Sequence, residues 1–419
     1  MRRCRSKVSD VIPANQHVVI VGAGHAGGTA AVLLRQLGHT GPLTLLGEEA
    51  LPPYQRPPLS KAWLKGEADE EALLLKPLEY YAVHGIAFHA NTRVVRLDRD
   101  AKELQLQDDS VISYDVLVIA TGARAIPLRI AGADLEGVMF LRTAQDAEEL
   151  KATIGPGKRL LVIGGGYIGL EVAATGRALG AEVIVVERES RLLARVACEA
   201  LSEFFRTYHE EQGVKFELGY TLTGLEGTYR RVTHALLSDG RALSCEAVVI
   251  GVGAHPNEEI GKEAGLECSR GIVVNLEART SDPNIFAIGD VAHRPMPIYG
   301  RMFRMESVPN ALEQAKQAAC AITGRAAPSP EVPWQWSDQY DVKLQIAGYP
   351  FDADLTLVRG QPSSKKFSVF HLKGDLVQAV EAINSPPDFM IGKQLIGNRK
   401  PVDKAKLVDS NISLKEIVA

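Results

Sequence analysis

Cysteine pairs, long apolar runs and an excess of one charge are all missing from this 419-residue sequence. Its cysteines (Cys4, Cys198, Cys245, Cys268 and Cys320) are scattered, without C-x-x-C or C-x₄-C spacing, so neither a disulfide framework nor a metal site is expected. No apolar stretch reaches the roughly 18 residues of a membrane span, and a net charge of −4 gives no sign of a nucleic-acid surface. These absences favour a reducing cytoplasm. With no cysteine in 48–66, they also argue against enzymes that reduce disulfides or peroxides through a thiol.

A basic stretch without an apolar core opens the sequence, so residues 1–16 do not read as a secretory signal. We expect a flexible extension over residues 1–15. The remaining length is enough for two to four domains with large cores.

What the sequence does contain is a dinucleotide-binding fingerprint, and it contains two copies. Residues 22–27 read GAGHAG after the apolar run 18–21, and residues 164–169 read GGGYIG after the apolar run 160–163. In G-x-G-x-x-G the first glycine allows the tight turn, the second lets backbone approach a pyrophosphate, and the third lets helix and strand pack closely. The helix that follows turns its free N–H groups toward the phosphates. Two such sites in one chain predict electron transfer between two dinucleotides, most simply NAD(P)H and FAD.

An acidic residue follows each copy at about the distance expected for a ribose-binding carboxylate, roughly 20 residues past the last glycine. Glu48 ends the second apolar run of the first copy, with Glu49 as the alternative, and Glu187 ends that of the second. A carboxylate at Glu187 would repel a 2′-phosphate, which favours NADH over NADPH, although Arg188 next to it could weaken the effect.

The order of patterns predicts an α/β fold with two Rossmann-like nucleotide-binding domains, glutathione-reductase-like, and a C-terminal α+β domain. Buried strands are expected within 115–123, 247–253 and 284–290, a helix over 310–323, and short strands such as 367–372 near the end. The proline-rich loop 51–61 is expected to be stiff rather than helical. The predicted boundaries are an extension (1–15), an FAD-binding domain (16–124 and 251–330), an inserted NAD-binding domain (125–250) and the C-terminal domain (331–419).

Several stretches resemble the NADH-dependent ferredoxin reductases of the putidaredoxin-reductase type, with rubredoxin reductases close by. The resemblance covers nearly the whole chain from about residue 17. It rests on residues 22–27 (GAGHAG), 57–61 (PPLSK), 120–122 (ATG), 140–143 (FLRT), 164–171, 280–283 (TSDP), 287–290 (AIGD), 306–311 (ESVPNA) and 334–340 (WQWSDQY). Two features depart from the family pattern: Gln335 stands where an aromatic residue is common, and the basic N-terminal extension is not typical.

The resemblance implies FAD in the first domain and NADH in the inserted one. Hydride would pass from NADH C4 to flavin N5, and single electrons would then pass to a [2Fe–2S] ferredoxin, or to a rubredoxin. The ferredoxin would supply an oxygenase such as a cytochrome P450.

The same resemblance places Lys61 and Glu171 beside the flavin ring as an ion pair, and these are the candidate catalytic residues. A cation there would stabilise the anionic reduced flavin, and the carboxylate would orient the lysine. Without the resemblance the two residues read as a surface lysine and a helix-face glutamate.

The remaining candidates are cofactor contacts. Asp290 ends a buried apolar strand, where a charge needs partners such as the ribityl hydroxyls of FAD. Val94 and Val308 rest on the resemblance alone, and Arg56, Arg195 and Trp336 also read as ordinary surface or core residues. The expected FAD contacts are Gly22, Gly24, Ala26, Gly27, Glu48, Arg56, Lys61, Val94, Ala120, Thr121, Gly122, Arg142, Asp290, Val308 and Trp336. The expected NADH contacts are Gly164, Gly166, Tyr167, Ile168, Gly169, Glu187, Arg195 and Gly253.

Two other functions stay open from the sequence: an NADH oxidase, and a redox-responsive NADH-binding flavoprotein that acts through its interactions. For a ferredoxin, the net acidic chain would need a local basic patch. The candidates are Lys65 and the later basic residues Lys365, Lys366, Lys393, Arg399, Lys400, Lys404 and Lys406.

Overall fold

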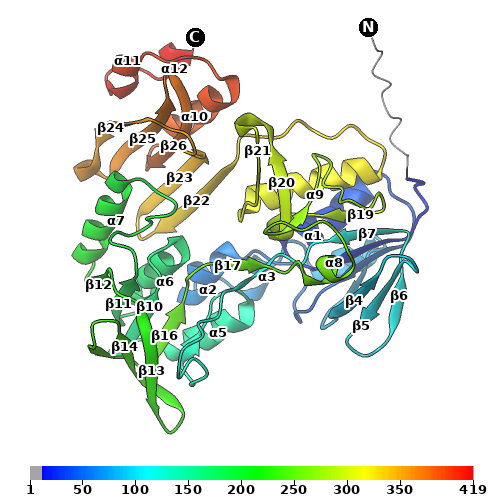
Figure 1. The fold of residues 1–419 in the computed structure, drawn as a ribbon, viewed down its shortest axis with the longest axis horizontal. Helices are drawn as coiled ribbons and strands as arrows, with labels where there is room; N and C mark the ends of the chain where they lie inside the picture. Colours follow the sequence, from blue (N-terminus) through cyan, green and yellow to red (C-terminus); the bar gives the residue numbers. More distant parts are fainter. Residues whose placement is uncertain (1–11, 419) are drawn as a thin grey trace. The chain divides into compact units, whose positions relative to one another are not determined.

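The computed structural model describes residues 12–418, and these fall into two compact units (Figure 1). Unit 1 comprises residues 12–55, 74–123 and 256–331, and unit 2 comprises 56–73, 124–255 and 332–418. Most of the expected N-terminal extension, residues 1–11, lies outside the described residues. The domain boundaries drawn from the sequence stay predictions.

Unit 1 is built on a parallel five-stranded sheet in the order β19-β7-β1-β2-β3. Four of its strands, β19, β7, β1 and β2, are buried along their whole length. This is expected when helices cover both faces of a parallel sheet. Helix α1 (His25–Gln36) packs along α9 (Val308–Ile322). The strands are β1 (Val18–Val21), β2 (Leu43–Leu46), β3 (Ala87–His89), β7 (Val116–Ile119) and β19 (Ile285–Ala287).

Two small sheets and short helices complete unit 1. One sheet contains β4 (Val94–Asp98), β5 (Glu103–Leu106) and β6 (Val111–Ser113), and the other contains β18 (Ile272–Val273), β20 (Ala292–Met296) and β21 (Arg301–Phe303). The helical pieces are α4 (Leu78–Val83), α8 (Glu259–Glu263), η2 (Gly289–Val291) and η3 (Pro297–Tyr299).

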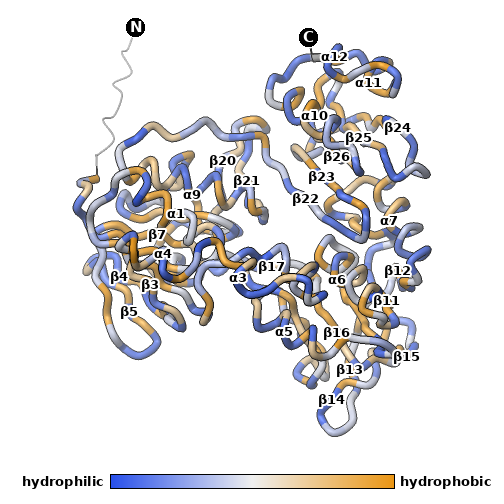
Figure 2. Tube along the Cα trace, turned by 180° about the vertical axis from the view of Figure 1, so that it is seen from behind, coloured by the Kyte–Doolittle hydropathy of each residue, from blue (hydrophilic) through white to orange (hydrophobic). Residues whose placement is uncertain are grey.

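Unit 2 repeats the parallel arrangement with a sheet in the order β12-β11-β10-β16-β9. Figure 2 shows apolar segments along β11 and β16 of this sheet. Its strands are β9 (Val138–Met139), β10 (Arg159–Ile163), β11 (Glu182–Glu187), β12 (Lys215–Leu218) and β16 (Ala247–Ile250). The helices are α5 (Ala144–Thr153), α6 (Tyr167–Ala178) and α7 (Glu199–Glu211), and an antiparallel sheet contains β13 (Leu222–Thr228), β14 (Arg231–Leu237) and β15 (Ala242–Ser244).

The C-terminal part of unit 2 is an antiparallel sheet in the order β22-β23-β26-β25-β24, with α10 (Pro386–Asn398) against it (Figure 1). The expected α/β fold with a C-terminal α+β part is therefore confirmed. The strands are β22 (Trp334–Gln339), β23 (Val342–Gly348), β24 (Leu355–Gln361), β25 (Lys366–Lys373) and β26 (Leu376–Ile383), and η4 (Pro362–Ser364), α11 (Lys404–Val408) and α12 (Lys415–Val418) complete this part.

The proline-rich loop differs from the sequence expectation. Residues Pro57–Ser60 form a 3₁₀ turn, η1, which leads into α2 (Ala62–Lys65) and then α3 (Glu70–Leu73). Prolines are compatible with the first positions of a helix, where their missing N–H has no intrahelical role. Contacts of η1 with α5 and α6 then fix the loop within unit 2.

Two short strands, β8 (Ala123–Ala125) and β17 (Ala254–Pro256), occur where the chain passes from one unit to the other. Within residues 12–418, no helix combines the length and the apolar character that a membrane crossing requires.

Candidate functional site

The first fingerprint forms a tight turn between β1 and α1 in unit 1. Gly22 has a φ of 108°, and a Cβ built there would lie 2.2 Å from the Ala120 carbonyl oxygen. A Cβ at Gly27 would lie 1.9 Å from the Gly22 oxygen, so the helix start packs directly on the turn. A Cβ at Gly24, in contrast, would meet nothing within 4 Å. The turn is closed on the strand side and open at its second glycine, which fits a pyrophosphate lying against bare backbone.

The second fingerprint has the same geometry between β10 and α6 in unit 2. Gly164 has a φ of 109°, with a Cβ position 2.5 Å from the Gly251 oxygen, and the Cβ position of Gly169 is 2.1 Å from the Gly164 oxygen. A Cβ at Gly166 would again meet nothing within 4 Å. Both copies therefore provide the cradle that a dinucleotide needs.

The expected FAD contacts of unit 1 gather at the carboxyl edge of its sheet. Glu48 follows β2 and is exposed, with its carboxylate 3.6 Å from the Arg93 guanidinium. Asp290 lies in η2 just after β19. Thr121 follows β7, and its hydroxyl donates to the Asn257 carbonyl oxygen at 2.8 Å. Since parallel strands end at one edge, these groups share that edge with Gly24. The alternative acid, Glu49, accepts a hydrogen bond from the Tyr54 hydroxyl at 2.5 Å.

Glu187 ends β11 and bonds directly to the second fingerprint. Its Oε2 accepts the Gly165 backbone N–H at 2.7 Å, and its Oε1 accepts the Glu189 N–H at 2.9 Å. Arg188 points elsewhere, because its guanidinium lies 3.1 Å from the Glu189 carboxylate. Arg195 donates to the Val252 carbonyl oxygen at 3.4 Å, next to Gly253. The structure thus brings Glu187, Arg195 and Gly253 to the same edge as the glycine loop.

Lys61 and Glu171, 110 residues apart in sequence, form an ion pair in unit 2 with 2.6 Å between Nζ and Oε2. The Lys61 side chain is 21% exposed and that of Glu171 is 7% exposed. Lys61 lies between η1 and α2, and Glu171 lies in the first half of α6. The proline-rich turn therefore presents a partly accessible cation held by a buried carboxylate.

Hydrogen bonds extend from Glu171 into the C-terminal sheet. The Ser60 hydroxyl donates to Oε2 at 2.5 Å, and the Ser337 hydroxyl donates to Oε1 at 2.6 Å. The Gln339 amide donates to the Ser337 oxygen at 3.1 Å, and its own oxygen lies 2.7 Å from His209 Nε2. Burial lowers the pKa of His209 to about 4, so this imidazole stays neutral. We call Ser60, Ser337, Gln339 and His209 the Glu171 network.

No role for the Glu171 network was predicted from the sequence. Ser60 and Ser337 stand inside stretches that resemble the reductases, and this was the one available signal. Gln339 stands in the same stretch as Ser337, whereas His209 carries no such signal, because its partner Gln339 lies 130 positions away in the chain.

The remaining predicted residues have less distinctive surroundings. Ala26 and Val94 are buried, Val94 within the apolar core of unit 1, while Val308 at the start of α9 is half-buried. Arg56 donates to the Arg142 carbonyl oxygen in unit 2. Trp336 neighbours Ser337 on β22 and therefore faces the opposite side of the strand, with its ring 5.6 Å from that of Trp334.

The start of α6 presents Tyr167 and Ile168. Ile168 is 50% exposed. The Tyr167 hydroxyl donates to the Val196 carbonyl oxygen at 3.1 Å, and burial raises the pKa of this phenol well above its usual value.

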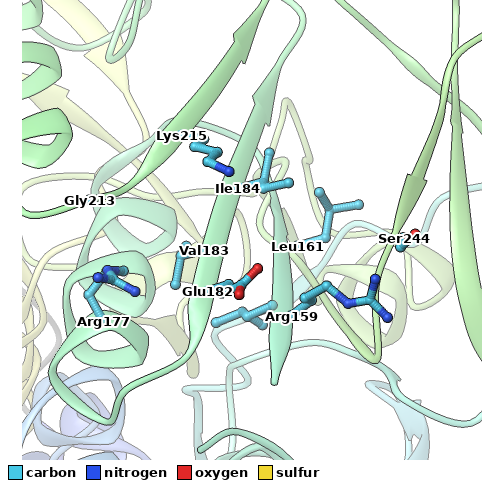
Figure 3. A pocket seen from close by; sticks show the side chains of 10 residues that line it. Arg159, Leu161, Arg177, Glu182, Val183, Ile184, Gly213, Lys215 and Ser244 are labelled. Atoms are coloured by element: carbon cyan, nitrogen blue, oxygen red, sulfur yellow. The ribbon is translucent and has the colours of Figure 1, made fainter. Parts of the chain in front are cut away.

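A separate cavity of about 150 Å³ lies at the amino edge of the unit 2 sheet (Figure 3). Arg159, Glu182 and Lys215, the first residues of β10, β11 and β12, line it together with Arg177. Nucleotides bind at the carboxyl edge of parallel sheets. This cavity is therefore not the dinucleotide site.

The four cysteines that the structure describes are free thiols. Burial raises the pKa of Cys245 to about 11 and that of Cys198 to about 12, and it also raises the pKa of Cys268. A protonated thiol is a poor nucleophile. These three thiols are therefore unsuited to disulfide or peroxide chemistry in this state.

Comparisons with known proteins agree with this geometry. Residues 16–315 match the pyridine nucleotide-disulphide oxidoreductase family, and residues 334–418 match the C-terminal domain of reductases. The probable ferredoxin reductase CtmF of Castellaniella defragrans is 50% identical over 402 residues, which cover 96% of this chain and 98% of that protein.

Two solved structures are also similar over nearly their full length. The reductase in the covalent putidaredoxin reductase–putidaredoxin complex superposes with a TM-score of 0.95 at 41% identity, covering 97% of this chain and 99% of that one. The ferredoxin reductase for the CYP199A2 system from Rhodopseudomonas palustris gives a TM-score of 0.93 at 40% identity, covering 97% of this chain and all of that one.

The fold and the paired fingerprints thus define a pyridine-nucleotide-dependent flavoprotein oxidoreductase, a class that implies FAD and NAD(P)H. Within the pyridine nucleotide-disulphide oxidoreductase family, the chain belongs to the ferredoxin reductases of the putidaredoxin-reductase type.

Proposed function

We propose that this protein carries electrons from NADH, through FAD, to a [2Fe–2S] ferredoxin that supplies an oxygenase such as a cytochrome P450. The observation that carries the proposal is the pair of open glycine cradles, one in each unit, together with the Lys61–Glu171 ion pair. The four cysteines that the structure describes are free thiols, which fits a reaction in the reducing cytoplasm.

FAD is assigned to the carboxyl edge of the unit 1 sheet, where Gly24 admits the pyrophosphate and Glu48 accepts ribose hydroxyls. Asp290 would accept hydrogen bonds from the ribityl hydroxyls, and these would be the partners that a carboxylate at this edge requires. When bound, FAD supplies the conversion of a two-electron hydride donor into single electrons. The protein binds and orients the reactants.

Lys61 and Glu171 are the residues proposed to act on the flavin. The Lys61 ammonium would stabilise negative charge on the reduced ring, at a cost in solvation that its partial exposure keeps small. Glu171 holds the ammonium in place, and hydroxyl donors from Ser60 and Ser337 hold the carboxylate. The chain thereby keeps a cation in a fixed position without a proton-transfer step.

NADH is assigned to the unit 2 cradle, with Glu187 selecting it over NADPH. Its carboxylate already accepts two backbone N–H groups, which hold it at the loop where the adenosine ribose would lie. A 2′-phosphate would place a like charge beside it.

The partner proposal draws on the similar proteins. One similar reductase was solved in a covalent complex with putidaredoxin, and another serves the CYP199A2 system. A rubredoxin is the second candidate acceptor, since the rubredoxin–NAD(+) reductase of Pseudomonas putida is 39% identical over 369 residues.

A steady-state acceptor panel tests this proposal. The protein is purified, its FAD is released by heat and quantified, and NADH oxidation is followed with oxygen alone, a [2Fe–2S] ferredoxin or a rubredoxin. We expect about one FAD per chain and the fastest turnover with ferredoxin. A folded protein that binds no FAD, or one that oxidises NADH equally fast with oxygen alone, would contradict the proposal.

A further inference from the structure

Three side chains with metal-binding atoms converge in unit 2, away from the Lys61–Glu171 pair. The Cys198 sulfur, a His371 ring nitrogen and a Glu381 carboxylate oxygen all lie within 4.8 Å of one another. His371 Nε2 and Glu381 Oε2 are 3.0 Å apart. Cys198 is the N-cap of α7, and the other two residues stand on the paired strands β25 and β26.

Burial makes this cluster unusual. His371 and Glu381 are 4% and 2% exposed, and a buried carboxylate requires a compensating charge or hydrogen bonds. A bound cation would replace the proton of the Cys198 thiol and coordinate the Glu381 carboxylate, which now lies 3.0 Å from His371 Nε2.

The donor set and its geometry fit one divalent ion of intermediate softness. Zinc binds thiolate, imidazole and carboxylate in a tetrahedron that places neighbouring ligand atoms roughly 3.5 Å apart. His371 Nε2 and Glu381 Oε2 lie 3.0 Å apart, and all three ligand atoms lie within 4.8 Å of one another, so the cluster is of the size that one ion spans. One thiolate and one carboxylate neutralise a divalent cation, and the imidazole stays uncharged.

The surroundings orient the imidazole as outer partners of metal sites do. His371 Nδ1 lies 3.4 Å from the Thr356 hydroxyl on the neighbouring strand β24, which leaves Nε2 directed at the cluster. Cys198 is less buried than its two partners, so an ion has a route of entry.

We propose that Cys198, His371 and Glu381 form a binding site for one Zn²⁺-like divalent ion. The ion would tie the start of α7 to the C-terminal sheet. The residues just before α7 include Arg195 and Val196, which contact Val252 and Tyr167 near the second fingerprint. The scattered cysteines gave no spacing signal for this site, because its ligands are 173 and 10 positions apart and only the fold brings them together.

Equilibrium dialysis of the FAD-loaded protein against Cd²⁺ alone, with ultraviolet detection of the cadmium–thiolate band, tests the site. Cys198→Ser is the key variant. Serine is a favourable N-cap for α7, so the helix start is preserved while the thiolate is lost. Cys268→Ser, at another partly buried cysteine, is the matched control.

We expect wild type and Cys268→Ser to bind one more Cd²⁺ than Cys198→Ser and to show the thiolate band. Since losing an outer partner alone costs up to about 100-fold in affinity, losing this direct ligand should weaken the site by more than about 100-fold. Glu381→Gln should weaken it in the same direction while leaving the thiol intact. Equal Cd²⁺ binding by wild type and Cys198→Ser, or no thiolate band in wild type, would overturn the proposal and leave a hydrogen-bonded triad.

Discussion

At the scale of single residues, we propose that Glu187 links the shape of the nucleotide loop to the choice of cofactor. Its carboxylate accepts the Gly165 N–H at 2.7 Å, so it holds the loop in place. Its neighbour Arg188 pairs with Glu189 and does not cancel the charge. The distance from glycine to acid could be read from the sequence, whereas the direction of Arg188 could not.

We expect wild type to prefer NADH over NADPH by at least about tenfold in kcat/KM, equivalent to about 1.4 kcal/mol. Glu187→Gln should bring the preference close to unity, because the amide oxygen can still accept the Gly165 N–H while the negative charge is gone. Steady-state kinetics with both cofactors measures this. Equal use by wild type, or an unchanged preference in the glutamine variant, would show that Glu187 is not the selecting residue.

At the scale of elements, β22 serves two purposes because its side chains alternate. Ser337 faces Glu171 on one side of the strand, and Trp336 faces the other side with Trp334. The sequence predicted both fingerprints and the strands β1, β2, β7, β19, β10, β11 and β16, since these follow from local apolar runs and glycine spacing, but it did not predict the edge strands β3, β9 and β12. It could not predict the Glu171 network, because Ser337 and Glu171 are 166 positions apart and meet only after folding.

Ser337→Ala should lower the free energy of unfolding by about 1–3 kcal/mol, because the buried Glu171 carboxylate loses a donor. It should also slow NADH-driven electron transfer roughly tenfold, since the ion pair is held less firmly. Ser337→Thr should restore both properties.

The matched control is Ser368→Ala, which removes a hydroxyl donor to Asp388 at 2.9 Å in the same sheet. It should cost similar stability and leave electron transfer intact. Equal activity of the two alanine variants would mean that Ser337 serves stability alone.

Stability should depend on pH through His209. Burial lowers its pKa to about 4 from an ordinary value of 6.5, so between these values the unfolded chain binds a proton that the folded chain does not. The contribution of His209 to the free energy of unfolding is therefore complete above pH 6.5. It declines by up to about 3 kcal/mol as the pH falls toward 4. Denaturant unfolding of wild type and His209→Phe across this range measures it. The free energy of unfolding of the variant should change less steeply with pH than that of wild type. An identical slope would show that His209 is not the source of the pH dependence. A substitution at the exposed His89 is the control.

At the scale of the whole molecule, a net charge of −4 leaves ferredoxin docking to local basic groups. The basic residues expected to form one cluster divide into two. Lys366 starts β25, whereas Pro401, next to Lys400, pairs with Leu376 at the far end of the β25–β26 hairpin. The eight residues of β25 are joined by seven steps of about 3.3 Å each, which separates these ends by roughly 23 Å. The sequence could not reveal this separation, which depends on strand direction.

We expect Lys393 of α10 and Lys400, which follows this helix, to steer ferredoxin, since Lys393 lies over the Trp334 ring beside Trp336. Rising salt should slow ferredoxin reduction and barely affect a small neutral acceptor. Charge reversal of Lys393 and Lys400 should also slow ferredoxin reduction, and several-fold more than charge reversal of Lys366 does. Stopped-flow rates over a salt series measure both. A rate indifferent to salt and to all these reversals would indicate apolar docking around Trp336.

The most direct test of the central claim is an anaerobic single turnover in two mixing steps. The protein is first mixed with one equivalent of NADH, and the reduced protein is then mixed with an oxidised [2Fe–2S] ferredoxin while the flavin and cluster absorbances are followed together. The account predicts that NADH bleaches the flavin and that ferredoxin restores its colour at the rate at which the cluster becomes reduced. A flavin that NADH does not bleach, or one that stays reduced in the presence of ferredoxin, would contradict it.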